Sequence, residues 1–92
     1  MAAWQIEFTK AATRDFQRLD LAVRRQIYAR LDWFSENFDF VNKVPLHGEW
    51  SDFMKLRMGD WRIMYRVNNT AKIIEVAYID HRSRAYRNRK RK

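Results

Sequence analysis

The most suggestive chemistry in the sequence lies in a group of cationic side chains near its middle. Lys55 and Arg57 are two residues apart in an alternating segment, so in a β-strand they would project from the same face. A Gly59-Asp60 turn would then bring Arg62 opposite Arg57. Like charges placed opposite one another destabilise a sheet, so the pattern favours an anionic ligand such as phosphate. Basic side chains that simply splay into solvent would give the same pattern.

The net charge of +8 is concentrated near the C-terminal end of the sequence. Residues 1–80 hold twelve Lys or Arg against eleven Asp or Glu, whereas residues 81–92 hold seven Lys or Arg and no acid. A polybasic segment attracts any polyanion, including RNA, DNA and acidic lipid or protein surfaces. A solvated tail that aids only solubility would have the same composition, so the charge indicates a class of partner without naming one.

The composition excludes several kinds of protein. At 92 residues, with 47% hydrophobic and 15% aromatic residues, the chain suits one domain with a real core. It has no cysteine and two histidines, which excludes disulfides and Cys-ligated metals, and we expect neither a metal nor a cofactor. The sequence has no apolar run of about 18 residues and no signal-peptide pattern, so we expect a cytoplasmic protein without a membrane segment.

The elements that must position the cations begin with a strand and two helices. Residues 4–9 alternate apolar and polar side chains and predict a strand. Thr9 is then a candidate cap for a helix over about 10–19, and Asp20 for a second helix that extends to about residue 38. The outer faces of both helices carry mixed charges, Asp15 among them, which indicates a solvated surface without chemistry.

Three strand-like segments follow an irregular connection at 37–49 and predict an antiparallel meander. They cover residues 52–58, 61–67 and 72–80. The sequence therefore predicts an α+β fold: an N-terminal strand, a two-helix hairpin packed on an antiparallel sheet of about four strands, and a basic C-terminal segment. We expect a single domain over residues 1–87 and a basic tail over 88–92, whose order the sequence leaves open.

Alternation within the three strands predicts two different sheet faces. The face under the helices would consist of Met54, Leu56, Met58, Trp61, Ile63, Tyr65, Val67, Ile74, Val76 and Tyr78. The opposite face would present Phe53, Lys55, Arg57, Arg62, Met64 and Arg66. Three tryptophans, Trp4, Trp33 and Trp61, lie in apolar registers, and we expect them to pack in the core.

The segment Lys55–Tyr65 resembles the RelE/ParE toxin superfamily in its basic strand, Gly-Asp-Trp turn and Arg-containing apolar strand. The resemblance extends from the opening strand and the helix start at 9–12, through 46–49, to residues 79–87. It implies a bacterial or archaeal type II toxin with its active site on a concave sheet face. RelE-type members cleave mRNA in the ribosomal A site. The implied partners are a cognate antitoxin, mRNA and the ribosome with its 16S rRNA, and no small-molecule cofactor.

The resemblance also implies a role for individual residues. Lys55 matches a lysine that acts in proton transfer, and Arg62 matches an arginine that stabilises the phosphate. Arg82 matches an arginine assigned to stabilisation of the leaving group or of charge, and Tyr86 matches a tyrosine that orients or stacks the RNA. The further RNA-binding residues that we expect are Arg57, His81, Arg84 and Arg87. The implied reaction is metal-independent attack of a ribose 2′-hydroxyl on the adjacent phosphate, with cations stabilising the developing charge.

Phe53 departs from the RelE pattern, which has a second lysine at this position. The general base is therefore open between Lys55 and His81, with a bracing role for the imidazole favoured. The same fold also hosts ParE-type toxins, which poison DNA gyrase and have no nuclease site. A non-enzymatic nucleic-acid-binding module and a toxin that has lost catalysis are two further candidates. We expect His47 to be structural and leave the role of Trp50 open.

Overall fold

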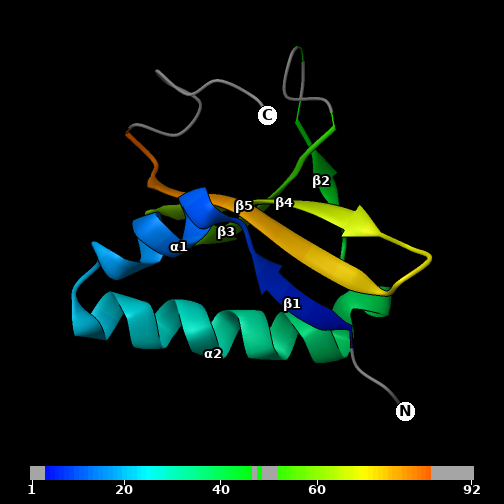
Figure 1. Ribbon diagram of the computed structural model, residues 1–92, viewed down its shortest axis with the longest axis horizontal. Helices are drawn as coiled ribbons and strands as arrows, with labels where there is room; N and C mark the ends of the chain where they lie inside the picture. The colour runs from blue at the N-terminus through cyan, green and yellow to red at the C-terminus, as the bar shows by residue number, and fades with distance from the viewer. Residues whose placement is uncertain (1–3, 47, 49–51, 84–92) are drawn as a thin grey trace.

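The computed structural model describes residues 4–46, 48 and 52–83, which form one five-stranded sheet with its longer helix across one face and its shorter helix beside the last strand (Figure 1). The elements in chain order are β1 (Gln5–Phe8), α1 (Lys10–Gln17), α2 (Leu21–Asn37), the 3-10 helix η1 (Phe38–Phe40), β2 (Val44–Pro45), β3 (Met54–Met58), β4 (Trp61–Asn68) and β5 (Ile73–His81). The strand order in space is β1-β5-β4-β3-β2, so the first strand lies beside the last.

The predicted α+β class and the antiparallel meander of β3, β4 and β5 are confirmed, with two differences in the sheet. A two-residue strand, β2, pairs with β3 inside the segment predicted to be irregular, and so short a strand has no periodic signal. In addition, β1 pairs with β5 in the parallel direction. Local alternation predicts a strand but not its partner, so it gives no sign of this long-range pairing.

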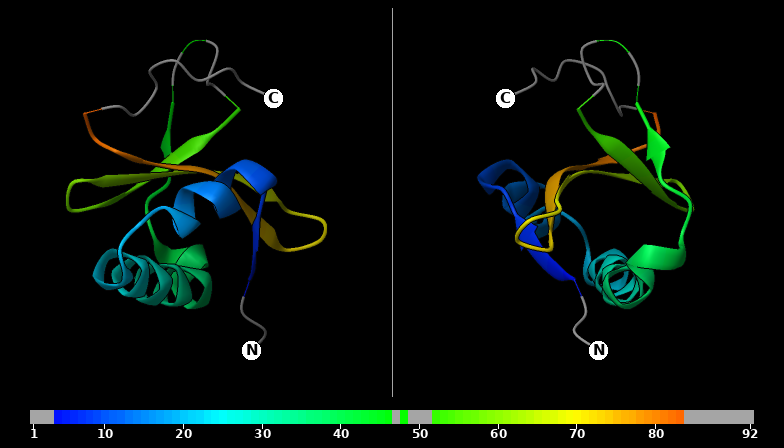
Figure 2. Two further views of the ribbon diagram at one scale, coloured as in Figure 1. Left: turned by 60° about the vertical axis from the view of Figure 1, so that its left-hand side comes forward. Right: turned by 90° about the vertical axis from the view of Figure 1, so that its right-hand side faces the viewer.

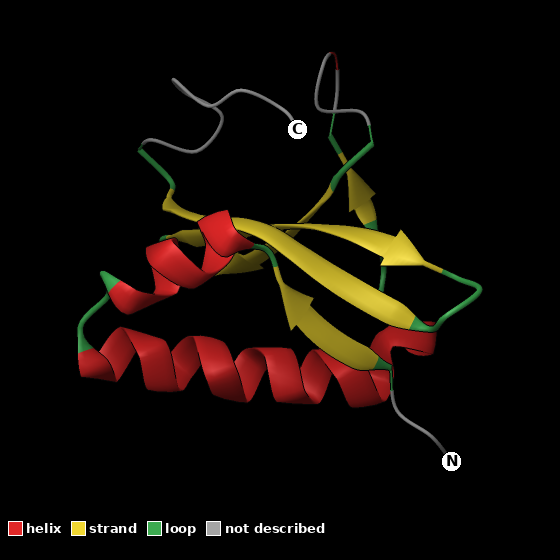
Figure 3. Ribbon diagram, viewed as in Figure 1, coloured by secondary structure: helices red, strands yellow, loops and turns green. Residues whose placement is uncertain are grey.

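Both helices, drawn in red in Figure 3, begin after the predicted caps Thr9 and Asp20. The Thr9 hydroxyl accepts a hydrogen bond from the Ala12 backbone N–H at 3.0 Å, and the Asp20 carboxylate accepts one from the Val23 N–H at 2.9 Å. Each cap satisfies a backbone donor that has no partner within its helix. None of the described helices is long and apolar enough to cross a membrane.

The main core lies between the helices and one face of the sheet, and α2 is the longer covering element (Figure 2). Its buried members are Trp4, Ala12, Ile27, Leu31, Phe34, Phe38, Leu56, Ile63, Tyr65, Ile74, Val76 and Ile79. The Tyr65 ring meets the Phe34 ring edge-on, with centroids 5.2 Å apart. Burial raises the pKa of the Tyr65 phenol to about 12. The main core thus covers one face of the sheet.

A β-bulge at Ala77 changes which side chains of β5 face the helices. The pairing of β4 with β5 shifts register beside Met64, which pairs with Tyr78, and Ala77 has no counterpart in β4. The extra residue reverses the alternation, so Ile79 joins the main core and Tyr78 lies on the opposite side. The prediction that Tyr78 packs under the helices is therefore wrong, because it assumed unbroken pairing.

Helix α1 is fastened to β5 at this bulge. The Thr9 hydroxyl donates to the Ala77 carbonyl at 2.8 Å, and the Asp15 carboxylate accepts from the Ile79 N–H at 2.9 Å. Asp15 is only 9% exposed, so its predicted place on a solvated helix face is wrong. The charge pattern of a helix does not show which of its side chains lies beside an unpaired backbone N–H of a strand. As a result, α1 covers the part of β5 that lies beyond its pairing with β1.

Replacing Asp15 with alanine should lower the free energy of unfolding by about 1–3 kcal/mol. The change would leave the buried Ile79 N–H without its carboxylate acceptor. Urea denaturation of the purified protein measures the loss, with Asp32→Ala on the exposed part of α2 as the matched control. If both variants lost the same free energy of unfolding, the hydrogen bond between Asp15 and Ile79 would make no specific contribution to stability.

The tryptophans follow the packing prediction with one exception. Trp4 is buried in the main core, and the partly buried Trp61 packs against the same core. Trp33 is 45% exposed, and the Arg30 guanidinium lies over its ring at 4.9 Å. The prediction for Trp33 is wrong because the buried positions of α2 follow Ile27, Leu31 and Phe34, and residue 33 lies beside that stripe.

Candidate functional site

The sheet face away from the helices carries the predicted cationic residues. Two adjacent cross-strand rows lie on this face: Arg57–Arg62–Asp80 and Lys55–Met64–Tyr78. Arg57 and Arg62 are direct partners across β3 and β4, as the Gly59-Asp60 turn predicted. Strand geometry separates the two rows by roughly 7 Å. The structure therefore brings Lys55, Arg57 and Arg62 together on one surface.

These cations lie close enough to affect protonation. Burial lowers the pKa of the Lys55 ammonium, and the nearby charges of Arg57 and Arg62 lower it further. A lowered pKa makes the ammonium a stronger acid and increases the neutral fraction at a given pH. The three residues repel one another in the protein alone, and a bound anion would relieve that repulsion.

The Gly59-Asp60 turn orients two arginines at this end of the sheet. The Arg62 Nη1 group donates to the Gly59 carbonyl at 2.8 Å and to the Trp61 carbonyl at 3.0 Å. The Arg82 backbone N–H donates to the Asp60 carbonyl at 2.7 Å, and the Arg82 Nε lies 3.5 Å from an Asp60 carboxylate oxygen. Arg82 therefore lies at the same turn as Arg62, although it follows the last strand.

Replacing Gly59 with alanine should lower the free energy of unfolding by about 1–2 kcal/mol. Gly59 has a φ of +58°, a left-handed conformation that alanine adopts poorly. No atom lies within 4 Å of an added Cβ, so the backbone alone causes the loss. Urea denaturation tests this, with Asp60→Ala as the control that removes an exposed ion pair and should lose less than about 1 kcal/mol. Equal losses would contradict the role assigned to Gly59.

His81 lies on the opposite side of the sheet from the cations. Its partner across β4 is Trp61, and the two rings meet edge to face with centroids 5.3 Å apart. The His81 Nδ1 atom accepts the Ser83 backbone N–H at 3.3 Å and lies 3.0 Å from the Ser83 hydroxyl. The structure does not bring this imidazole to Lys55; it contacts Trp61 of β4 and Ser83, which follows β5.

The sheet face that carries Lys55, Arg57 and Arg62 also has apolar side chains. Alternation places Phe53 and Met64 on this side, as expected, but both side chains are fully buried. With Leu46, Ala77 and Tyr78 they form a second, smaller core. The Leu46 N–H donates to the Phe53 carbonyl at 3.0 Å, so the segment after β2 runs alongside Phe53. This long-range contact explains the burial, which alternation alone does not show.

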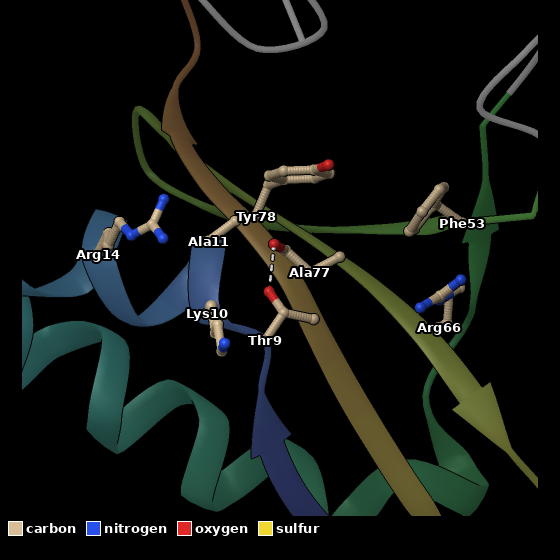
Figure 4. A pocket seen from close by; sticks show the side chains of 8 residues that line it. All are labelled: Thr9, Lys10, Ala11, Arg14, Phe53, Arg66, Ala77 and Tyr78. Atoms are coloured by element: carbon tan, nitrogen blue, oxygen red, sulfur yellow. Dashed lines mark hydrogen bonds between the residues drawn. The ribbon is translucent and has the colours of Figure 1, made fainter. Parts of the chain in front are cut away.

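A cavity of about 300 Å³ opens beside this second core (Figure 4). Its lining residues are Thr9, Lys10, Ala11, Arg14, Phe53, Arg66, Ala77 and Tyr78. Arg66 is ion-paired with Glu75, and its guanidinium lies over the Phe53 ring at 5.1 Å. Sequence reasoning missed Lys10 and Arg14 as site residues. Their spacing of four on one helix was the available signal, but a solvated helix surface has the same spacing.

Several predicted residues lie outside the described part of the chain. They are Tyr86, Arg84, Arg87, His47 and Trp50. The roles assigned to these residues, and the tail at 88–92, remain predictions. Among the residues that the structure does describe, no group of three or more His, Asp or Glu side chains could hold a metal ion.

Solved structures of small toxins share this fold. The isolated RelE toxin of E. coli has a TM-score of 0.71 and 20% identity, over 96% of this chain and 88% of that one. The toxin in the RelBE2 complex of Mycobacterium tuberculosis has a TM-score of 0.67 and 24% identity, over 90% and 95%. The archaeal RelE–RelB complex of Pyrococcus horikoshii gives 0.65 and 25%, over 91% and 100%. The fold is therefore that of the RelE-type toxins.

The family follows from the sequence itself. Residues 6–86 match the model of the ParE toxin of type II toxin–antitoxin systems, parDE. The chain belongs to this toxin family, within the RelE/ParE superfamily, which confirms the resemblance found in the sequence. No curated protein sequence matches it.

Proposed function

We propose that this toxin is an endoribonuclease that cleaves mRNA on the ribosome. The observation that supports the proposal is the group formed by Lys55, Arg57 and Arg62, with Arg82 tied to the same turn. Attack of a ribose 2′-hydroxyl on the adjacent phosphate builds negative charge on the phosphate oxygens. Cations that are already in position stabilise this charge as it develops.

In the proposed reaction, Lys55 takes the proton from the attacking 2′-hydroxyl, because its lowered pKa increases the fraction of neutral amine at a given pH. Arg62 binds the phosphate, and Arg82 stabilises the departing 5′-oxygen as the bond from phosphorus to that oxygen breaks. The departing 5′-oxygen takes a proton from solvent water, and Lys55 later returns its proton to solvent, so the products are a 2′,3′-cyclic phosphate and a 5′-hydroxyl end. Lys55 is preferred to His81 as the base because the imidazole packs against Trp61 on the other side of the sheet.

The remaining predicted residues bind the substrate in this proposal. Tyr86 stacks on an RNA base, and Arg57 contributes a further phosphate contact. Arg84 and Arg87 attract the RNA, whereas His81 acts through its contacts at the end of β5. The reaction needs no metal and no small-molecule cofactor, and it takes place in the cytoplasm, where mRNA, 16S rRNA and the ribosome are present.

A cognate antitoxin is the proposed protein partner. The similar toxins from Mycobacterium tuberculosis and Pyrococcus horikoshii were solved in complex with RelB-type partners. A cationic face is best covered by an acidic or amphipathic segment, which would also exclude RNA. We expect the antitoxin either to occupy this face or to displace the C-terminal segment.

Poisoning of DNA gyrase is the second candidate, favoured by the family whose model matches. Such a toxin needs no arrangement of cations around a scissile phosphate. A non-enzymatic nucleic-acid-binding protein and a toxin without remaining catalysis explain the cations as binding residues alone. These candidates differ in what happens to nucleic acids inside the cell.

Mapping mRNA ends on translating ribosomes separates the candidates. Expression of the chain should produce new 5′ ends within coding regions, and Arg82→Ala should reduce them strongly. Growth arrest without new RNA ends would refute the nuclease, and DNA breaks in that case would support gyrase as the target. Salt-sensitive RNA binding with neither kind of break would indicate a binding module.

A further inference from the structure

We infer that the cavity beside Phe53 and Tyr78 binds one nucleobase of the RNA whose phosphate lies on the cationic row. This inference rests on the proposed function and adds a base contact to it. The phosphate contacts proposed for the cations near the Gly59-Asp60 turn carry no sequence information, since phosphates are the same at every nucleotide. A neighbouring base site would let the toxin favour some positions in an mRNA over others.

The position of the cavity relative to Lys55 supports this assignment. Tyr78, which lines the cavity, lies in the same cross-strand row as Lys55. Phe53, on its other side, precedes Lys55 by two residues, a displacement of roughly 7 Å along an extended chain. That displacement is comparable with the span of one nucleotide from phosphate to base. A strand bound at Lys55 therefore has a base within reach of the cavity.

The lining of the cavity suits a flat aromatic ring with polar edges. Its floor is largely apolar, because the buried side chains of Phe53, Ala77 and Tyr78 line it. Figure 4 shows Arg14 and Arg66 on opposite sides of this floor, with Lys10 and Thr9 along a third side. Guanidinium planes stack on bases, and an apolar floor replaces the water that covers the ring. A volume of about 300 Å³ suits one base, being at the small end of ligand cavities.

Charge favours a nucleic acid over a protein side chain in this cavity. Lys10 and Arg14 add two cations from α1 to the Lys55 group on the sheet. The charge of Arg66 is balanced by Glu75. Arg66 therefore contributes mainly the planar face of its guanidinium, which lies over the Phe53 ring. Lys10 and Arg14 thus place two cations at the α1 edge of the cavity, as expected for a site that binds part of a polyanion.

Short RNAs with a single abasic nucleotide provide the test. Five-nucleotide RNAs, each lacking one base, are titrated against the purified full chain by fluorescence anisotropy at fixed salt. At one position, loss of the base should weaken binding by about tenfold, in the range of measured base stacking. The Ala11→Leu change fills the cavity from α1 without altering a charge, and should abolish this difference. Ala22→Leu, the same change at an exposed position of α2, is the matched control and should preserve it.

The outcomes separate this inference from the proposed function. If every abasic RNA binds as tightly as the intact one, or if Ala11→Leu keeps the difference, the base site is overturned. If Ala11→Leu fails to fold, Arg14→Gln replaces it. This variant should reduce the difference in affinity between intact and abasic RNA at least threefold, and an unchanged difference would also overturn the base site. Abasic-sensitive binding without cleavage on ribosomes refutes the proposed function alone. If Ala11→Leu cleaves mRNA at the same positions as the parent protein, the base site alone is refuted. If Ala11→Leu instead binds the antitoxin more weakly and RNA equally well, the cavity belongs to the antitoxin interface and the base site is overturned.

Discussion

Replacing Arg62 with alanine should lower the rate of mRNA cleavage on ribosomes by about 100- to 1,000-fold. Two backbone carbonyls of the β3–β4 turn hold the Arg62 guanidinium before RNA binds. A donor that is already fixed loses little conformational freedom in the transition state, so its removal affects the rate strongly. Primer extension on ribosome-bound mRNA measures the effect as the initial rate of cleavage.

Two variants control for charge and for shape. Arg25→Ala removes the same charge from an exposed position of α2 and should cleave at the parent rate. Arg62→Lys keeps the charge but lacks the planar fork, so its rate should fall between those of the parent and the alanine variant. Equal rates in Arg62→Ala and Arg25→Ala would show that Arg62 has no part in the reaction.

Replacing Lys55 with methionine should lower the cleavage rate by about 100- to 10,000-fold and raise stability at neutral pH by roughly 0.2–1 kcal/mol. The rate falls because the proposed proton acceptor is lost. The free energy of unfolding rises because Arg57 and Arg62 no longer repel a third cation. Single-turnover cleavage and urea denaturation of the same samples measure both changes. A variant that lost activity together with stability would indicate a structural role for Lys55.

The pH dependence provides a sharper test of the same residue. The folded-state pKa of Lys55 lies below its usual value of 10.5, so between these two values the unfolded chain binds more protons. Stability from this group therefore rises as the pH increases through the folded-state pKa, and Lys55→Met should lack that rise. The cleavage rate should increase over the same range. Arg57→Gln should move both increases to higher pH, and unchanged profiles would contradict the assignment.

Much of the cationic face was predictable because its determinants are local. Lys55 and Arg57 are separated by the strand period of two, and a two-residue turn fixes Arg62 opposite Arg57. The caps at Thr9 and Asp20 are local in the same way. At these positions the spacing of a few neighbouring residues determines the geometry, and the prediction and the structure agree.

The features that the sequence did not reveal depend on contacts between distant segments. The bulge at Ala77 reverses the alternation of β5, and Asp15 finds a backbone donor there that no helix pattern shows. The cavity follows from both, since Ala77 and the start of α1 contribute to its lining. Phe53 was recognised as a departure from the RelE pattern, but its place in a second core required the structure.

The pairing of the first strand with the last has a consequence for synthesis of the protein. Within the described sheet, β1 pairs with β5 alone, so residues 5–8 have no strand partner until residues 73–76 have left the ribosome. Such long-range pairing forms late in folding. The bond from Arg82 to Asp60 also awaits the end of β5. The sheet of this toxin is therefore incomplete during most of elongation, and its edge strand pairs only after β5 has been made.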